Sequence, residues 1–139
     1  MKYLLDTDTC VFWLRGQASV RQQLAAARVE TIGVAVLTVA ELRYGAACSR
    51  NPADNHQAID DFISGLQVVD FAFETARLFG DLKAQLRAQG QLLEDFDLLI
   101  AATALTHGLT LVTNNTAHFQ RVSNLTLANW VLPPAPFAK

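Results

Sequence analysis

Cysteine is scarce in this sequence. Only Cys10 and Cys48 occur, they lie far apart, and neither belongs to a Cys-x-x-Cys or Cys/His spacing. This excludes a disulfide framework and a zinc site, and it suits a reducing cytoplasm. Long hydrophobic runs are missing too, because Asp6 and Asp8 interrupt the apolar stretch near the start of the chain. We therefore expect neither export nor membrane contact.

The sequence also lacks an excess of basic charge. It has 11 Lys and Arg against 13 Asp and Glu, a net charge of −2. Proteins that bind nucleic acid through bulk charge neutralise phosphates with Lys and Arg, so this balance does not favour that class. The charged fraction is only 17%, which suggests that a partner covers part of the surface.

The length and composition indicate one compact domain. With 139 residues and 51% hydrophobic content, a chain of this size buries most of the surface that it exposes when unfolded. We place this single domain at residues 1–132. The run Pro133-Pro134-Ala135-Pro136 predicts an extended C-terminal tail over residues 133–139.

Short apolar stretches alternate with longer helical patterns along the chain. Strands are expected at 3–5, 31–36, 66–69, 109–113 and 125–127. Helices are expected at 10–15, 19–28, 38–48, from Pro52 to about Gly65, around Leu78, Leu82 and Leu86 up to Gly90, and at 96–107. This order predicts an α/β fold of three layers, in which helices cover both faces of a parallel sheet of about five short strands.

Four polar residues stand at the ends of these elements. Asp6 and Asn115 each follow a strand, Glu41 falls in the first turn of the helix expected from Thr38, and Asp97 lies at another helix start. Each has a local explanation. Asp6 suits a helix cap, Thr38 to Glu41 matches a capping box, Asp97 opposes the helix dipole, and Asn115 suits a turn.

The joint placement of these residues points to a further role. Ligands of parallel sheets bind at the carboxyl ends of the strands, where Asp6, Glu41 and Asp97 are expected to meet. Carboxylates that share a site either take up a proton or hold a cation. Oxygen ligands without His or Cys select Mg²⁺, Mn²⁺ or Ca²⁺, so the sequence predicts a divalent metal site.

Four stretches of the sequence contain these polar residues in a recognisable context. The stretches are Leu4-Leu5-Asp6-Thr7-Asp8-Thr9, Thr38-Val39-Ala40-Glu41-Leu42-Arg43-Tyr44-Gly45, Asp97-Leu98-Leu99-Ile100-Ala101-Ala102, and Leu111-Val112-Thr113-Asn114-Asn115 with Phe119, Arg121-Val122 and Asn129-Trp130. They resemble the PIN-domain nucleases, and among them the VapC-type toxins, in the order of that family and from about Lys2 to Trp130. Each is weak alone, whereas the four together are specific.

The resemblance implies a metal site and an activity. In the family, acids at the positions of Asp6, Glu41 and Asp97 bind the metal, and a fourth acid often stands where this chain has the neutral Asn115. Some relatives have Glu in place of His118, which we interpret as a surface residue. The implied protein is a Mg²⁺- or Mn²⁺-dependent endoribonuclease, the toxin of a toxin–antitoxin pair that cleaves RNA, especially tRNA, and so inhibits translation.

The resemblance also suggests roles and partners. Asp6 and Asp97 would be metal ligands, Glu41 a ligand or an orienter through water, and Asn115 would position water or phosphate. A VapB-type antitoxin and a homodimer are implied. Phe12 and Trp13 are candidates for the antitoxin groove or, equally, for the core. Four basic residues are hypothesised to gather at a dimer groove: Arg15, Arg43, Arg50 and Arg87.

Two other functions remain open from the sequence. Asp6-Thr7-Asp8 after a strand is similar to the nucleophile and acid pair of haloacid-dehalogenase-like phosphatases. Those enzymes need a Lys near the phosphate, and Lys83 is the only lysine away from the two ends of the chain. The other alternative is a non-catalytic partner-binding module, in which the acids merely cap helices.

Overall fold

The computed structural model describes residues 1–132, so the predicted tail at 133–139 lies outside the described residues. The strands are β1 (Tyr3–Leu5), β2 (Ile32–Ala35), β3 (Gln67–Val69), β4 (Thr110–Val112) and β5 (Leu127–Ala128). The helices are α1 (Thr7–Leu14), α2 (Ala18–Ala27), α3 (Val36–Ala47), α4 (Pro52–Ile63), α5 (Phe73–Ala88), α6 (Asp95–His107) and α7 (Thr116–Phe119), with a 3₁₀ turn η1 (Val29–Thr31).

The five strands form one parallel sheet in the order β3-β2-β1-β4-β5. Strand β1 is central, with Leu4 opposite Gly33 of β2 and Leu111 of β4. The chain builds the sheet outward from β1 to β3 on one side and then from β4 to β5 on the other. The order therefore reverses between β1 and β4, which is where parallel sheets of this kind open a crevice for ligands.

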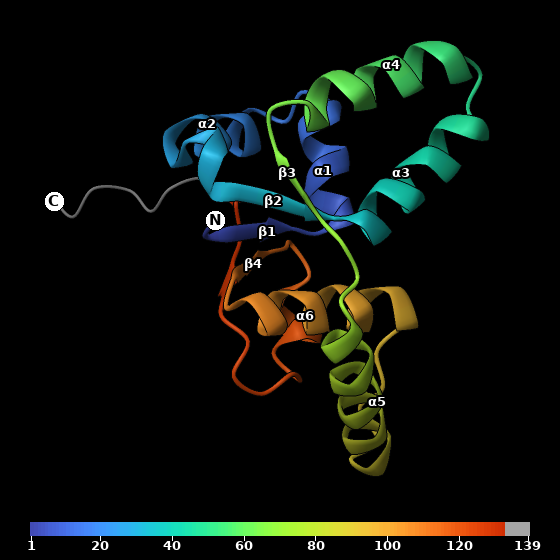
Figure 1. Cartoon of the computed structure of the whole chain (residues 1–139). Helices are drawn as coiled ribbons and strands as arrows, with labels where there is room; N and C mark the ends of the chain where they lie inside the picture. The colour runs from blue at the N-terminus through green and yellow to red at the C-terminus, as the bar shows by residue number, and fades with distance from the viewer. Residues whose placement is uncertain (133–139) are drawn as a thin grey trace, which may run out of the picture.

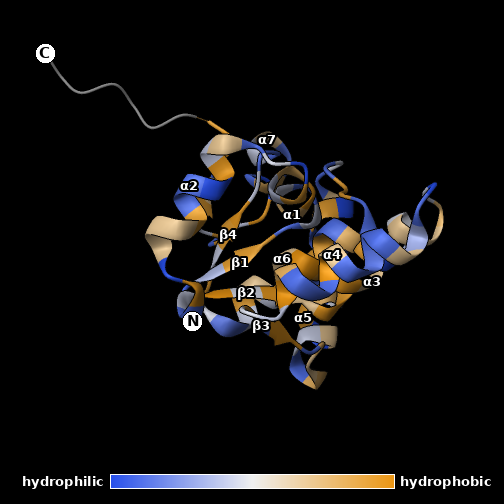
Figure 2. Ribbon diagram, turned by 90° about the horizontal axis from the view of Figure 1, so that it is seen from above, coloured by the Kyte–Doolittle hydropathy of each residue, from blue (hydrophilic) through white to orange (hydrophobic). Residues whose placement is uncertain are grey.

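Two hydrophobic cores lie on opposite faces of the sheet. Leu5 belongs to the core that packs against α1, α2, α3 and α4, whereas its neighbour Leu4 belongs to the core that packs against α5, α6 and α7. Successive strand residues point to opposite faces, so one short apolar strand serves both cores. The layers are visible in Figure 1. Figure 2, seen from above, shows largely hydrophobic strands enclosed by helices with polar outer faces. The predicted α/β fold of three layers is confirmed.

Several predicted boundaries are wrong by a few residues. Helix α1 begins at Thr7, not Cys10, because the Asp6 side chain caps it directly after the strand. Helix α3 begins at Val36, not Thr38, so the last apolar residues assigned to the second strand belong to the helix. Strand β5 is Leu127–Ala128, later than the predicted 125–127. Apolar residues suit either element, so the pattern could not locate these transitions.

Among residues 1–132, none of the helices is both long enough and apolar enough to cross a bilayer.

Candidate active site

Asp6 occupies the end of the central strand. Its backbone N–H donates to Val112 O of the neighbouring strand at 3.0 Å, which continues the β1–β4 pairing by one residue. Its side chain is 4% exposed, and Oδ1 accepts a hydrogen bond of 2.8 Å from the Thr9 backbone N–H. The predicted cap is therefore real. Burial raises the pKa of Asp6, while hydrogen bonds from Thr113 and Thr9 act in the opposite direction.

Glu41 is held in place from a different element. Because α3 begins at Val36, Glu41 lies in the interior of the helix, and the predicted capping box with Thr38 is wrong. Its Oε1 instead accepts a hydrogen bond of 2.5 Å from the hydroxyl of Thr7, the first residue of α1. The same hydroxyl lies 3.3 Å from Thr38 Oγ1. Two helix surfaces that face each other therefore position this carboxylate.

Asp97 lies in the first turn of α6, as predicted. It is half-buried, and its pKa is raised to about 6, first by desolvation and then by the charges of Asp6, Glu94, Glu41 and Asp8. Each of these neighbours comes from the N-terminal end of a helix or from α3. The shift is an electrostatic sign that the acids from separate parts of the chain occupy one region.

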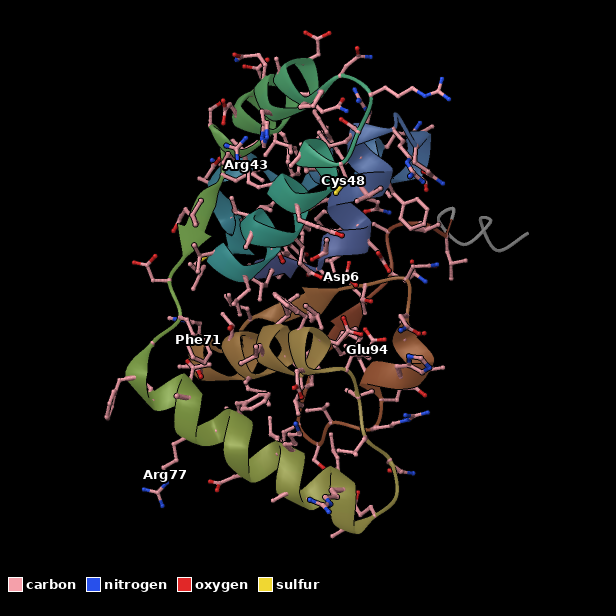
Figure 3. All side chains as sticks on the ribbon, turned by 90° about the vertical axis from the view of Figure 1, so that its right-hand side faces the viewer. Asp6, Arg43, Cys48, Phe71, Arg77 and Glu94 are labelled. Carbon is pink, nitrogen blue, oxygen red and sulfur yellow. The ribbon has the colours of Figure 1, made fainter. Side chains whose placement is uncertain are left out.

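The structure brings the acids together without forming a ready-made chelate. In Figure 3, Asp6 lies between the upper helices and α6, and Glu94 lies on the same side of the molecule. Yet within residues 1–132 no three His, Cys, Asp or Glu side chains are close enough to hold one ion as they stand. Their oxygen atoms repel one another, as the pKa of Asp97 records, and a divalent cation would relieve that repulsion. The all-oxygen donor set suits Mg²⁺ or Mn²⁺.

Two cavities adjoin these acids. One of about 380 Å³ runs between α1, α3 and α4 and is lined by Thr7, Glu41 and Arg15 together with apolar side chains such as Val11 and Leu14. The other, of about 280 Å³, lies between the start of α6 and α7. It is lined by Leu92, Leu93, Glu94, Asp97, Asn115, His118 and Arg121. Glu41 thus lines the first cavity and Asp97 the second, whereas Asp6 lines neither.

Asn115 stands immediately before α7 and lines the smaller cavity with Asp97. Its backbone N–H donates to the Thr113 hydroxyl at 2.9 Å, and its side-chain nitrogen lies 2.7 Å from His118 Nδ1. His118 is exposed, as expected of a surface residue, but it also lines the cavity. Thr113 is fully buried and hydrogen-bonded to Asp6, so it links the two strand ends.

For Phe12 and Trp13 the structure shows the core packing that the sequence offered as one alternative, and the antitoxin groove stays a prediction. Phe12 and Trp13 pack against the core on the α1 face, and Trp13 contacts Phe62 with ring centroids 4.6 Å apart. Arg43 bonds to Asp60 and, at 3.0 Å, to the backbone carbonyl of His56. Its charge therefore ties α3 to α4. The gathering of Arg15, Arg43, Arg50 and Arg87 at a dimer groove stays a prediction.

Three contributors were not predicted as site residues. These are Thr7, which bonds to Glu41, Thr113, which bonds to Asp6, and Arg121 in the smaller cavity. Threonine is common in strands and helix caps, so its residue type carries no signal of its own. The only available clue was position, since Thr7 and Thr113 directly adjoin strand ends.

Comparison with known proteins identifies the family. Residues 3–125 match the family described as "PIN domain". The chain is 36% identical over 132 residues to Ribonuclease VapC2 of Rickettsia felis, covering 94% of this chain and 98% of that protein. It is 36% identical over 131 residues to the tRNA(fMet)-specific endonuclease VapC of Shigella flexneri, again covering 94% and 98%.

Solved structures agree in fold over the same span. The chain matches VapBC2 from Rickettsia felis, bound to a DNA fragment from its promoter, with a TM-score of 0.88 and 36% identity over 94% of this chain and 99% of that one. It matches DNA-bound VapBC from Salmonella typhimurium with a TM-score of 0.89 and 31% identity over 94% and 98%.

Proposed function

Since the chain belongs to the PIN-domain family, we propose that it is a divalent-metal-dependent endoribonuclease and the toxin of a toxin–antitoxin pair. One observation carries this proposal beyond the resemblance. Asp97 has its pKa raised to about 6 by burial and by the charges of Asp6, Glu94, Glu41 and Asp8. Concentrated negative charge at a crevice in a parallel sheet is the setting in which a cation can be bound and used.

Asp6, Glu41 and Asp97 are the proposed metal ligands, with Mg²⁺ or Mn²⁺ as the ion. These three side chains supply only carboxylate oxygens, the donors that such ions prefer. When bound, the ion would supply a water of lowered pKa and neutralise charge on the phosphate. A hydrogen bond from the Thr7 hydroxyl holds the Glu41 carboxylate in place, and one from the Thr9 backbone N–H holds that of Asp6.

The residues of the chain would perform the remaining steps. Asp6, buried and held by Thr9, is a rigid anchor, while the half-buried Asp97 can adjust towards an ion. Asn115 lies beside Asp97 in the smaller cavity, where its amide would orient a water or a phosphate oxygen. No nucleophilic side chain is required for hydrolysis by an oriented water.

The relatives suggest the substrate and the partner. The protein from Shigella flexneri is named a tRNA(fMet)-specific endonuclease, and the solved Rickettsia and Salmonella neighbours are VapBC complexes. We infer that this chain cleaves tRNA in the cytoplasm, inhibits translation, and is neutralised by a VapB-type antitoxin. The homodimer implied by the resemblance is part of the same proposal.

The phosphatase alternative is not favoured. Asp8 is exposed on α1, and the Lys83 ammonium is paired with Asp95 at 2.9 Å. That reading therefore lacks the lysine it needs beside Asp6. The alternative of a non-catalytic partner-binding module explains Asp6 as a helix cap. It does not explain why several negative charges gather around Asp97.

An RNA cleavage assay tests the proposal. Purified protein should cleave tRNA in Mn²⁺ and leave it intact in EDTA. Asp6→Asn and Asp97→Asn should each lower the rate at least about a hundredfold, because each removes a charged ligand. Asp81→Asn, an exposed acid on α5, is the matched control and should cleave as the wild type does. Cleavage that survives in folded Asp6→Asn and Asp97→Asn would refute the assignment.

A further inference from the structure

The smaller cavity combines opposite charges from two elements. Glu94 and Asp97 come from the start of α6, whereas Asn115, His118 and Arg121 come from α7 and the residues around it. An acidic wall next to a metal site and a wall of hydrogen-bond donors suit different parts of one substrate. Of the three donor residues, the proposed mechanism uses only Asn115, which leaves His118 and Arg121 without a role.

The contact between Asn115 and His118 determines what the imidazole offers to a ligand. The amide nitrogen of Asn115 lies 2.7 Å from His118 Nδ1. An amide nitrogen is a donor, so Nδ1 acts as the acceptor and the proton of the neutral ring resides on Nε2. The imidazole, which lines the cavity, then has one N–H donor, on Nε2, and its tautomer is set by a neighbour that also lines the cavity.

Arg121 is held on the rim of the same cavity. Its Nη1 donates to the backbone carbonyl of Leu92 at 3.1 Å, which fixes the guanidinium beside the segment that leads into α6. A guanidinium has five N–H donors, so this bond leaves others for a ligand. Although Glu94 and Asp97 line the same cavity, no carboxylate forms an ion pair with Arg121 within residues 1–132.

We propose that His118 and Arg121 form a phosphate-binding subsite that holds a backbone phosphate of the RNA next to the scissile one. A planar guanidinium matches phosphate oxygens in a bidentate manner, and an imidazole N–H adds a third donor. The subsite is also consistent with the low content of basic residues. The Arg121 guanidinium raises the local positive potential at the cavity, where the RNA phosphate would bind, so a high overall positive charge is not required. This inference rests on the proposed nuclease function and deepens it.

Binding and kinetics of a short labelled single-stranded RNA, measured at pH 8, test the subsite. Arg121→Gln should raise both KM and the Kd measured in EDTA about tenfold, with kcat changed less than about twofold. The slope of log Kd against log salt should also fall by about 0.7, the value for one phosphate contact to a single strand. His118→Ala should raise KM about threefold without a change in slope, because a neutral donor releases no counterion.

Conservative variants separate binding from folding. Arg121→Lys keeps the positive charge, so the slope of log Kd against log salt should stay the same. It loses the bidentate geometry of the guanidinium, so KM should rise about threefold. His118→Gln keeps a side-chain donor and should recover most of the affinity lost in His118→Ala. Arg77→Gln is the matched control for charge, since Arg77 is exposed on α5 and lies away from Asp6 in Figure 3. Its KM and slope should equal those of the wild type.

The outcomes distinguish this inference from the proposed function. If the wild type cleaves RNA but Arg121→Gln and Arg121→Lys leave KM and slope unchanged, the subsite is refuted and the nuclease stands. If Arg121→Gln does not fold, an unchanged KM in Arg121→Lys refutes the subsite. If the wild type binds RNA through Arg121 but does not cleave it in Mn²⁺, the nuclease fails, and with it the place of the subsite beside a scissile phosphate, while the phosphate contact of Arg121 stands. If it does neither, both are refuted.

Discussion

The hydroxyl of Thr7 donates a hydrogen bond of 2.5 Å to Glu41 Oε1, although the two residues lie 34 positions apart in the chain. Thr7 opens α1 directly after the central strand, and Glu41 lies inside α3. The bond therefore joins the helices that follow the neighbouring strands β1 and β2. This hydrogen bond fixes the position of the Glu41 carboxylate, so removing the bond should have a measurable effect on activity.

Thr7→Val should lower kcat/KM about tenfold, because a hydrogen bond to a charged group contributes about 1.5 to 3 kcal/mol and 1.36 kcal/mol corresponds to tenfold in rate. Glu41→Gln should lower it further. In the double variant the two losses should not add, since both act on the same carboxylate. Kinetics of the four proteins on one RNA measure the coupling, and fully additive losses would show that Thr7 does not act through Glu41.

The stability of the metal-free protein should rise as the pH falls. The pKa of Asp97 is about 6 in the folded chain against an ordinary value of 3.8, so the folded state binds the proton more tightly than the unfolded state does. The stability that proton binding to Asp97 contributes is fully present at pH values below its ordinary pKa of 3.8, and it is lost as the pH rises through about 6. Thermal melts in EDTA between about pH 4.5 and pH 7.5 should therefore shift upward at acidic pH.

The variant Asp97→Asn isolates this effect from other titrating groups. It cannot ionise at this position, so the upward shift on acidification should be smaller than in the wild type. At pH 7.5 it should also melt higher than the metal-free wild type, because it lacks the charge that its acidic neighbours oppose. Parallel pH profiles for the two proteins would contradict the assignment of this shift to Asp97.

Divalent metal should stabilise the folded protein through the same acids. At a Mn²⁺ concentration a hundredfold above its Kd, the gain is about 2.7 kcal/mol by mass action. Calorimetry and thermal melts should show this gain in the wild type and in Asp81→Asn, and should show most of it lost in Asp6→Asn and Asp97→Asn. An equal Mn²⁺ shift in all four proteins would place the ion elsewhere.

Arg43→Met should lower the free energy of unfolding by about 1 kcal/mol and leave RNA cleavage unchanged. Arg43 bonds to Asp60 and to the His56 carbonyl, so it ties α3 to α4, and partly exposed ion pairs of this kind contribute modestly. Urea unfolding and the cleavage assay measure the two effects. A fall in RNA affinity in Arg43→Met would contradict this prediction and would place Arg43 on the substrate-binding surface.

Much of this fold follows from local patterns. Short apolar strands separated by helices are typically buried in a parallel sheet covered on both faces, which is the observed arrangement. Asp6 and Asp97 were found because each directly adjoins a strand or helix end, where the sequence signal is strongest. The single-domain prediction, with a boundary at residue 132, stays a prediction.

The amino-acid sequence by itself determined the class of fold and the order of the elements, because these depend on periodicity and on residues next to element ends. It also singled out Asp6, Glu41 and Asp97 as candidate ligands, an assignment that stays a prediction. Only the tertiary structure decided that α3 begins at Val36, that Thr7 holds Glu41, and that Arg121 shares a cavity with Asp97. Such contacts join segments far apart in the chain. Their partners are chosen by how the helices pack on the sheet, which no local pattern encodes.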